Sequence, residues 1–222
     1  MAYHHILNSE LTNLPKSNRF VSTKEFEKQI KFLSDNFTLI QLNSLCERQP
    51  DNKEQQIAIT IDDGYKNFFE NGFPIIEKYN LPVTIFIPTE KIDKKIFESD
   101  YECEIEYLTE NNISAISKSK LISIQAHGHK HIRLADVSQE QQEQEIKVSK
   151  EILQEITKKD ITGFCFPYGS YNNITKSILK KHDFCFACTT NTGFNSEPFE
   201  LLELKRVAVS SKFSISDFAN LL

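Results

Sequence analysis

The sequence lacks the features that mark several large protein classes. It has no tryptophan, one methionine, six glycines and seven prolines in 222 residues. The few glycines and prolines are spread thinly and mark no linker, so we expect one domain over residues 1–222. No apolar run approaches the roughly 18 residues of a membrane span, and no repeat is present.

Three common site motifs are also missing. The chain has no GxGxxG, no GxxxxGK[ST] and no GxSxG pattern. These absences argue against a dinucleotide site, a P-loop phosphate site and the usual serine hydrolase. The net charge of −5 argues against a general nucleic-acid partner, which would require a basic face.

The five cysteines do not suggest a disulfide framework. Their number is odd and no two spacings repeat. Cys185 and Cys188 form a CxxC pattern inside an apolar run that is typical of a buried strand. Residues three apart on a strand face opposite sides, so we expect two separate buried thiols there. Reduced cysteines, together with a start that lacks a signal-peptide pattern, favour a cytoplasmic location.

Short apolar runs alternate with amphipathic stretches along the chain. Ser22 is a candidate cap of the first helix, with Glu25 three residues later. This alternation of strands and helices predicts a parallel α/β sheet, either a barrel or a doubly wound sheet. We expect strands over 2–7, 37–40, 57–61, 82–87, 121–126, 161–166, 184–189 and 204–209, and further helices over 42–46, 65–79, 137–158, 173–181 and 216–222.

Two adjacent carboxylates follow the clearest strand. Asp62 and Asp63 come directly after residues 57–61 and before a helix, at the edge where parallel α/β folds place their active sites. Adjacent like charges repel, and a divalent metal held by one carboxylate would leave the other free as a base. The alternative is a helix N-cap.

Three of the six histidines follow the strand over 121–126. His127 and His131 are four residues apart, so on one helical turn both imidazoles would face the same way and share a metal. In an extended segment, His127 would pair with His129 instead. Imidazole suits zinc, nickel, cobalt or iron. The alternative is a solvated histidine-rich loop.

A third strand runs into Pro167-Tyr168-Gly169. This sequence forces a turn and can expose a backbone N–H beside an aromatic ring. Such a turn has the composition of an oxyanion contact next to a surface on which a sugar stacks. The alternative is an ordinary turn between a strand and a helix.

Together the three motifs resemble the polysaccharide deacetylase family of metal-dependent carbohydrate esterases. The segment Asp62-Asp63-Gly64 matches the family's T-F-D-D-G, and His127 to His131 matches its H-[ST]-x-x-H with glycine at the second position. Phe166 to Gly169 matches the core of R-x-P-Y-G. The opening Tyr3-His4, the helix around 26–33 and the segment 204–207 are similar to one branch of the family.

This resemblance implies a distorted (β/α) barrel of about seven parallel strands. It implies that Asp63, His127 and His131 hold a divalent metal, zinc before cobalt or nickel, and that Asp62 is the general base. Tyr168 would give a backbone N–H to the oxyanion. Family members remove an acetyl group from an N-acetylated sugar, and the turn at 167–169 would lie against that substrate.

The chain departs from the family pattern at two places. The arginine of the third motif falls on Cys165, and we hypothesise that Arg206 replaces it with a two-pronged contact to Asp62. The Leu-x-His that often supplies the general acid is also missing. His4 is the first candidate for that acid, followed by His5 and His182.

Three functional hypotheses follow. The first is a metal-dependent N-deacetylase that acts on an amino sugar in a polysaccharide or glycan precursor. The second is a degenerate member that binds a glycan without turnover. The third is a deacetylase or deformylase of a lipid-linked or nucleotide-linked sugar. Turnover that a chelator abolishes would separate the first from the second.

Overall fold

The computed structural model describes residues 1–8, 19–46, 55–99 and 102–222. Its centre is a seven-stranded sheet in which every neighbouring pair is parallel. The strands in spatial order are β1 (Ala2–Tyr3), β6 (Ile59–Ile61), β7 (Val83–Ile87), β10 (Ile122–Ala126), β11 (Gly163–Cys165), β12 (Phe186–Thr192) and β13 (Leu204–Arg206).

The two edges of this sheet meet. Ala2 on β1 forms a parallel bridge with Ala208, just after β13. Its N–H donates to the Val207 carbonyl at 2.9 Å, and its carbonyl accepts from the Val209 N–H at 2.9 Å. The sheet is therefore nearly closed, and the predicted distorted barrel of about seven parallel strands is confirmed.

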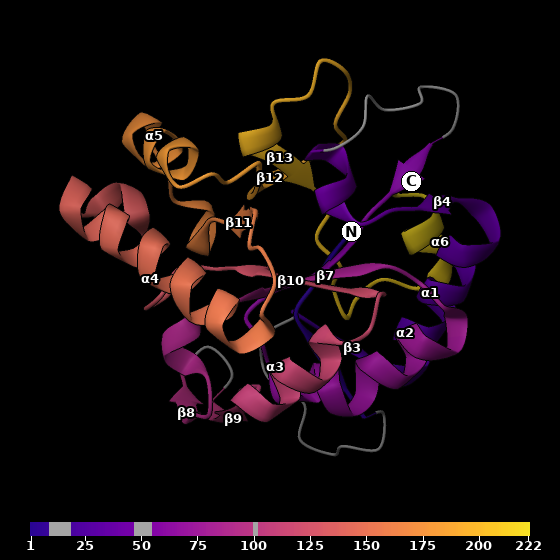
Figure 1. Cartoon of the computed structure of the whole chain (residues 1–222). Coiled ribbons are helices and arrows are strands. Elements are labelled where there is room, and N and C mark those ends of the chain that lie inside the picture. The colour runs from indigo at the N-terminus through magenta and orange to yellow at the C-terminus, as the bar shows by residue number, and fades with distance from the viewer. Residues whose placement is uncertain (9–18, 47–54, 100–101) are drawn as a thin grey trace.

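Helices surround the strands on the outside (Figure 1). Several helices begin at a side-chain cap: Ser22 accepts from the Glu25 N–H, and Ser138 and Asn172 each form a capping box. The helices are α1 (Thr23–Asn36), α2 (Phe73–Tyr79), α3 (Glu110–Ser117), α4 (Gln139–Thr157), α5 (Asn173–Lys181) and α6 (Ile215–Ala219), and the π-helical turn η2 (Phe68–Gly72) leads into α2.

The alternation of side chains along each strand creates two apolar layers. On β7, Val83, Ile85 and Ile87 belong to a large cluster shared with the helices, whereas Phe86 belongs to a small cluster inside the barrel. Gly163 makes room there, because a Cβ at this position would lie 2.2 Å from the Phe186 ring. The interior cluster consists of Leu42, Phe86, Cys165, Phe186, Cys188 and Leu204.

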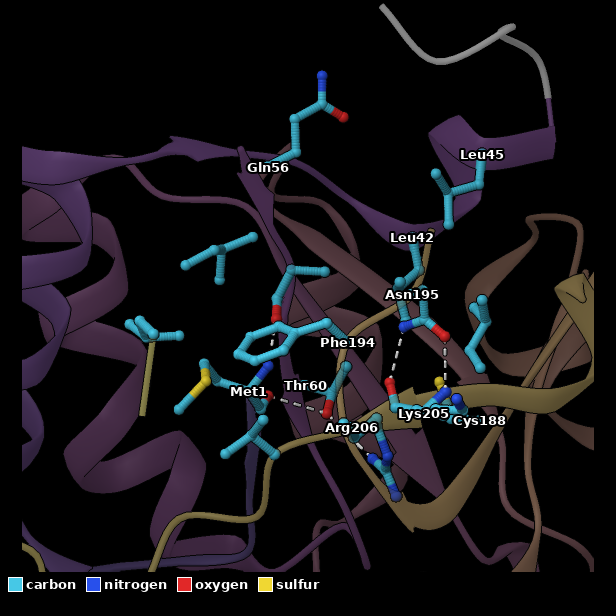
Figure 2. A pocket seen from close by; sticks show the side chains of 16 residues that line it. Met1, Leu42, Leu45, Gln56, Thr60, Cys188, Phe194, Asn195, Lys205 and Arg206 are labelled. Atoms are coloured by element: carbon cyan, nitrogen blue, oxygen red, sulfur yellow. Dashed lines mark hydrogen bonds between the residues drawn. The ribbon is translucent and has the colours of Figure 1, made fainter. Parts of the chain in front are cut away.

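A small hollow of about 110 Å³ opens beside this interior cluster, near the amino ends of β1, β6 and β13. Figure 2 shows its lining, which includes Leu42, Phe194 and Arg206. Asn195 borders the hollow, donating to the Lys205 carbonyl and accepting from the Lys205 N–H, each at 2.9 Å. These two hydrogen bonds connect the loop after β12 to β13.

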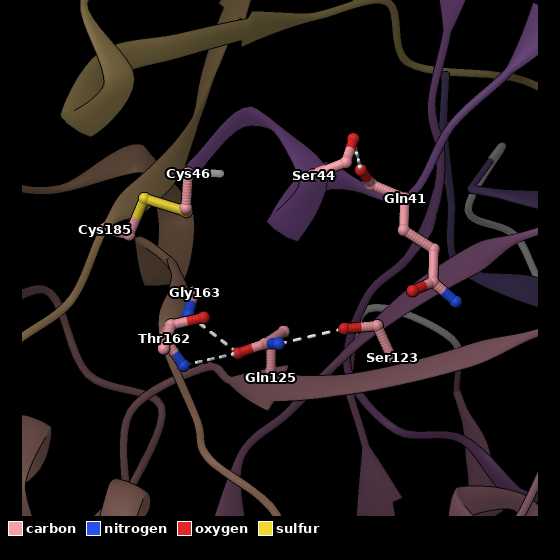
Figure 3. The surroundings of a disulfide bond; sticks show 8 residues. All are labelled: Gln41, Ser44, Cys46, Ser123, Gln125, Thr162, Gly163 and Cys185. Carbon is pink, nitrogen blue, oxygen red and sulfur yellow. Dashed lines mark hydrogen bonds between the residues drawn. A yellow bond between two sulfur atoms is a disulfide. The ribbon is translucent and has the colours of Figure 1, made fainter. Parts of the chain in front are cut away.

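A short 3-10 helix, η1 (Leu42–Cys46), lies at the amino end of the barrel and places Leu42 in the interior cluster. Cys46 forms a disulfide with Cys185, just before β12 (Figure 3). The prediction of two free thiols in the CxxC segment is therefore wrong for Cys185, although Cys188 is a buried free thiol. The pairing was not visible in the sequence because 139 residues separate the partners. It also removes the argument from reduced cysteines for a cytoplasmic location.

Several predicted elements differ in detail. The predicted strand 2–7 is two strands, β1 and β2 (His5–Leu7), and β2 pairs with β3 (Phe20–Ser22). The predicted strand 57–61 is also divided: β5 (Gln56–Ile57) pairs with β4 (Thr38–Leu39), and only β6 joins the barrel.

The sequence pattern predicts no element between β7 and β10, where the structure has α3 and an antiparallel hairpin. The hairpin strands are β8 (Lys95–Glu98) and β9 (Cys103–Glu106). Charged residues occupy half of these strand positions, so the apolar signal of a strand is weak. Within the described residues, no helix is both long enough and apolar enough to cross a membrane.

Candidate metal and catalytic site

The side chains singled out in the sequence converge at the carboxyl end of the barrel. They follow five different strands: His4 follows β1, the two aspartates follow β6, the histidines follow β10, Tyr168 follows β11, and Arg206 ends β13. A cleft of about 290 Å³ opens here, lined by His4, Asp62, Asp63, His127, His131, Tyr168 and Arg206 among others. The strand ends of a parallel barrel bring such distant residues together.

Asp63, His127 and His131 form a compact triad. The Asp63 Oδ1 atom lies 3.2 Å from His127 Nε2 and 3.3 Å from His131 Nε2, and the two Nε2 atoms lie 3.2 Å apart. Burial alone would raise the pKa of the Asp63 carboxyl, but the two imidazoles beside it hold that pKa well below its ordinary value. The triad therefore presents an ionised oxygen and two imidazole nitrogens to one point.

The triad fits a divalent transition metal. Three ligand atoms at about 2.0–2.1 Å from a tetrahedral zinc ion would be about 3.3 Å apart, which agrees with the three separations in the structure. A carboxylate with two imidazoles suits zinc, cobalt or nickel, and a three-residue site leaves a position open. The residues present thus fit the group that the sequence resemblance implies.

The histidine segment is a loop and not the helical turn that the i, i+4 spacing suggested. His131 has a φ of 60° and Gly128 a φ of +73°, so two left-handed residues turn the chain and aim both rings at Asp63. A side chain at position 128 would meet the Glu145 carboxylate at 3.3 Å. The predicted alternative, pairing of His127 with His129, does not occur, because His129 Nδ1 contacts Thr89 Oγ1 at 2.9 Å.

Glu145 on α4 is a site residue that the sequence reasoning missed. Its buried Oε2 accepts from the N–H of His129 at 3.0 Å and from that of Lys130 at 2.7 Å. These two hydrogen bonds hold the histidine loop against α4. A signal was present, because Glu145 lies beside Ile146 on the apolar stripe of the helix, where an unpaired carboxylate would be costly.

A backbone carbonyl orients His127. Its Nδ1 lies 2.7 Å from the Cys165 carbonyl oxygen, which can only accept a hydrogen bond. Nδ1 therefore carries the proton, and Nε2 offers its lone pair to the triad. This is the arrangement that metal-binding histidines commonly have.

Asp62 is paired with Arg206 through two parallel hydrogen bonds. Arg206 Nη1 donates to Oδ1 and Nη2 donates to Oδ2, each at 2.7 Å, so the two-pronged contact hypothesised from the sequence is present. Burial alone would raise the pKa of the Asp62 carboxyl, but the charge and hydrogen bonds of Arg206 hold it below its ordinary value. Within the described residues, the carboxylates of Asp62 and Asp63 pair with the side chains of other residues, which argues against the helix-cap alternative.

The guanidinium of Arg206 has further contacts besides those with Asp62. Nη1 also donates to Thr60 Oγ1 at 3.0 Å, and Nε donates to the Thr189 carbonyl at 3.1 Å. Nη2 lies 3.2 Å from the sulfur of Cys165, the residue at the position of the family's third-motif arginine. Arg206 thus reaches Asp62 from β13 across the space that the smaller Cys165 leaves open.

Among the other histidines, only His4 lines the cleft. Its Nε2 lies 4.0 Å from Asp62 Oδ2, and burial lowers the pKa of its imidazole. His5 stacks on Tyr65 with ring centroids 3.6 Å apart, and His182 contacts Glu143 at 3.1 Å beyond α5. The structure therefore separates His4 from the two candidates ranked behind it.

Tyr168 lies beside His131 of the triad. Its φ is 56°, and its half-exposed ring lies 4.7 Å from that of His131, measured between centroids. Gly169 follows with a φ of +65°, and a Cβ there would lie 2.0 Å from Thr190 Oγ1. The turn over 167–169 can therefore approach the cleft only with glycine at this position.

The family model described as polysaccharide deacetylase matches residues 49–187. The chain belongs to the polysaccharide deacetylase family. The matched segment contains the triad and Asp62, whereas Arg206 and His4 lie outside it. YxkH of Bacillus subtilis is 28% identical over 222 residues, which cover 98% of this chain and 73% of YxkH. The poly-beta-1,6-N-acetyl-D-glucosamine N-deacetylase of Staphylococcus epidermidis is 22% identical over 205 residues, covering 87% of this chain and 69% of that enzyme.

Solved structures of similar proteins have the same fold. The polysaccharide deacetylase BC0361 from Bacillus cereus superposes with a TM-score of 0.81 and 28% identity, covering all of this chain and 67% of that one. The Streptococcus pyogenes deacetylase PplD, solved in complex with acetate, gives a TM-score of 0.80 at 22% identity, covering all of this chain and 95% of that one. The second likeness, at its lower identity, concerns the fold alone.

Proposed function

We propose that this chain is a metal-dependent hydrolase that removes the N-acetyl group from an amino sugar in a polysaccharide or glycan precursor. One observation carries the proposal: the Asp63–His127–His131 triad opens into the same cleft as the Asp62–Arg206 pair. A ligand set and a separate ionised carboxylate, side by side in one cleft, are what amide hydrolysis with an activated water requires.

Asp63, His127 and His131 would hold the metal, with zinc first and cobalt or nickel as alternatives. When bound, a divalent ion of this kind polarises the acetyl carbonyl and lowers the pKa of a coordinated water. Glu145 and the Cys165 carbonyl support the ligands through the histidine loop and the His127 ring. This support keeps the ligand atoms in position before the metal binds.

Asp62 would act as the general base. Arg206 uses one lone pair of each carboxylate oxygen, and a carboxylate has about four such sites, so Asp62 can still accept a proton from the attacking water. Arg206 would be a positioning residue that holds the carboxylate plane. Its rigid planar fork suits this task better than a lysine ammonium would.

Tyr168 would supply the oxyanion contact, and His4 would be the general acid. The backbone N–H of Tyr168 would stabilise the oxyanion, and Pro167 and Gly169 would shape the surface beneath the sugar. His4 would pass a proton to the departing amine. Because burial favours its neutral form, His4 would not hold that proton beforehand but would receive it from Asp62, whose Oδ2 lies 4.0 Å from His4 Nε2, after Asp62 has taken it from the attacking water.

Acetate release from a series of N-acetylated oligosaccharides tests the proposal. We expect release by the purified protein, loss of release after treatment with a chelator, and recovery when zinc, cobalt or nickel is added back. Binding of the oligosaccharides without acetate release at any metal concentration would contradict the proposal and favour the glycan-binding alternative.

A further inference from the structure

The segment that follows β7 contacts the loop that carries the two histidines of the triad. It begins with the short 3-10 helix η3 (Thr89–Lys91) and continues as the hairpin of β8 and β9 (Figure 1). The Thr89 N–H donates to the Gly128 carbonyl at 3.2 Å, and the Glu90 N–H donates to the His129 carbonyl at 2.9 Å. These two backbone hydrogen bonds attach the start of the segment to the histidine loop.

The end of the same segment contacts the turn that carries the aspartate of the triad. The Leu108 N–H donates at 2.8 Å to the carbonyl of Gly64, the residue directly after Asp63. Tyr107 forms an antiparallel bridge with Tyr65, and the centroids of their rings lie 5.2 Å apart. One connection of the barrel thus reaches the aspartate turn at one end and the histidine loop at the other.

A side-chain network ties these two attachment points to each other. Lys91 follows the contact with the histidine loop, and Tyr107 precedes the contact with the aspartate turn. Lys91 Nζ donates to the Tyr107 hydroxyl at 2.9 Å and to Glu98 Oε1 at 2.7 Å, and the Tyr107 hydroxyl donates to the same Glu98 oxygen. Burial and the Glu98 carboxylate raise the pKa of the Tyr107 hydroxyl, so this group stays protonated and continues to donate.

The network is strong enough and well placed to keep the two loops together. Tyr107 is buried, and the side chains of Lys91 and Glu98 are only 19% and 24% exposed, so water screens their contacts less than it screens a surface ion pair. The ligands follow β6 and β10, which are not neighbours in the sheet, because β7 lies between them. The sheet therefore fixes the strand ends, and the segment after β7 connects the loops beyond them.

We propose that Tyr107, with Lys91 and Glu98, is a positioning residue that holds the aspartate turn and the histidine loop at the separation that metal binding needs. The inference rests on the metal site of the proposed function. None of the three side chains is a ligand, and they act through the backbone hydrogen bonds at the two ends of the segment. Glu145 supports the histidine loop alone, whereas this network spans both loops. Ligands that are held together before the metal arrives need less ordering when it binds.

The affinity for zinc, measured by competition with a chelator, tests the inference. Tyr107→Phe removes one hydroxyl and keeps the ring against Tyr65, so the dissociation constant should rise about tenfold, at the lower end of the range for residues that support metal ligands. Lys91→Met should have the same effect, and it is a second variant if Tyr107→Phe does not fold. Lys91→Arg should retain most of the affinity, because a guanidinium can still donate to both partners. Tyr79→Phe is the matched control: it removes a tyrosine hydroxyl that donates to Glu27 at 3.1 Å, between α2 and α1, and should leave the affinity unchanged.

Wild-type zinc affinity in Tyr107→Phe and Lys91→Met would overturn the inference, even with a lower unfolding temperature, since the network would then serve stability alone. If the wild-type protein binds none of the three metals, the metal site of the proposed function fails instead. Hydrogen exchange of the metal-free protein then decides the inference. In Tyr107→Phe the N–H groups of Glu90 and Leu108 should both exchange about tenfold faster than in the wild-type protein and the control. Faster exchange at one of them alone, or at neither, would reject the inference.

Discussion

The two ends of the barrel are built on different principles. At the carboxyl ends of the strands, ionised and titratable side chains are buried around a cleft, and Asp63, His131 and Tyr168 adopt left-handed backbone conformations. At the amino ends, a short helix and a disulfide close the barrel. The buried amide of Gln125 accepts from the N–H groups of 162 and 163, at the start of β11, at 3.0 and 2.7 Å (Figure 3).

This difference separates function from stability. Left-handed residues and buried charges cost free energy, and they persist at one end because the rest of the barrel holds them in place. At the amino end, the left-handed residues Asn80, Lys158 and Asp183 lie in exposed turns between helices and strands, and the disulfide cross-links the chain. Arg206 belongs to both regions, because its side chain lines the hollow of Figure 2 and its guanidinium reaches Asp62 in the cleft. Substitutions at the two ends should therefore affect different measurements.

The largest effect on turnover is expected at Asp62. Asp62→Asn keeps the shape of the side chain but removes the carboxylate that would take the proton from water, so kcat should fall by on the order of 10²-fold or more. Metal content should stay at the wild-type level. The substitution also leaves Arg206 without its counter-charge, so the unfolding temperature must be measured alongside kcat. Near-normal turnover in a folded, metal-loaded variant would rule out Asp62 as the base.

A smaller effect is expected at Arg206, where the two regions meet. Arg206→Lys keeps the positive charge but loses the paired hydrogen bonds, so Asp62 would be held less firmly. We expect kcat to fall about tenfold with unchanged metal content, on the scale of one charged hydrogen bond. Lys205→Arg, on the exposed neighbouring position of the same strand, is the matched control and should change neither value. Equal turnover in Arg206→Lys and the control would reduce the pair to a structural role.

Almost no effect on turnover is expected at the amino end. Replacing both Cys46 and Cys185 with serine should lower the free energy of unfolding by about 2–5 kcal/mol, because the disulfide closes a long loop in the unfolded chain. Turnover below the unfolding transition should stay at the wild-type level. Cys103→Ser, at an exposed free cysteine, is the control and should leave stability unchanged. A large loss of kcat in the double variant would mean that the two ends are coupled.

The sequence predicted the carboxyl end better than the amino end. The aspartates, histidines and the Pro-Tyr-Gly turn stand immediately after apolar strands, so their order along the chain indicated where they would meet. The contact of Arg206 with Asp62 was predictable because a nearly closed sheet brings its last strand close to its first ones. The ranges of α5 and η1 agree with the prediction.

Features that depend on distant contacts were not predictable. The disulfide joins two residues that the sequence places in unrelated elements, and the loop conformation at Gly128 depends on Glu145 of α4. The division of residues 57–61 between two sheets follows from pairing partners and not from local hydrophobicity. That residues 1–222 form one domain stays a prediction.

The metal content of two histidine variants tests the central claim most directly. His131→Ala removes a proposed ligand, whereas His129→Ala removes a neighbouring imidazole of the same loop that contacts Thr89 and not the triad. After exposure to zinc and removal of the excess, the wild-type protein and His129→Ala should each retain about one zinc ion per chain, and His131→Ala should retain almost none. Equal zinc retention by the two variants, or none by the wild-type protein with any of the three metals, would contradict the account.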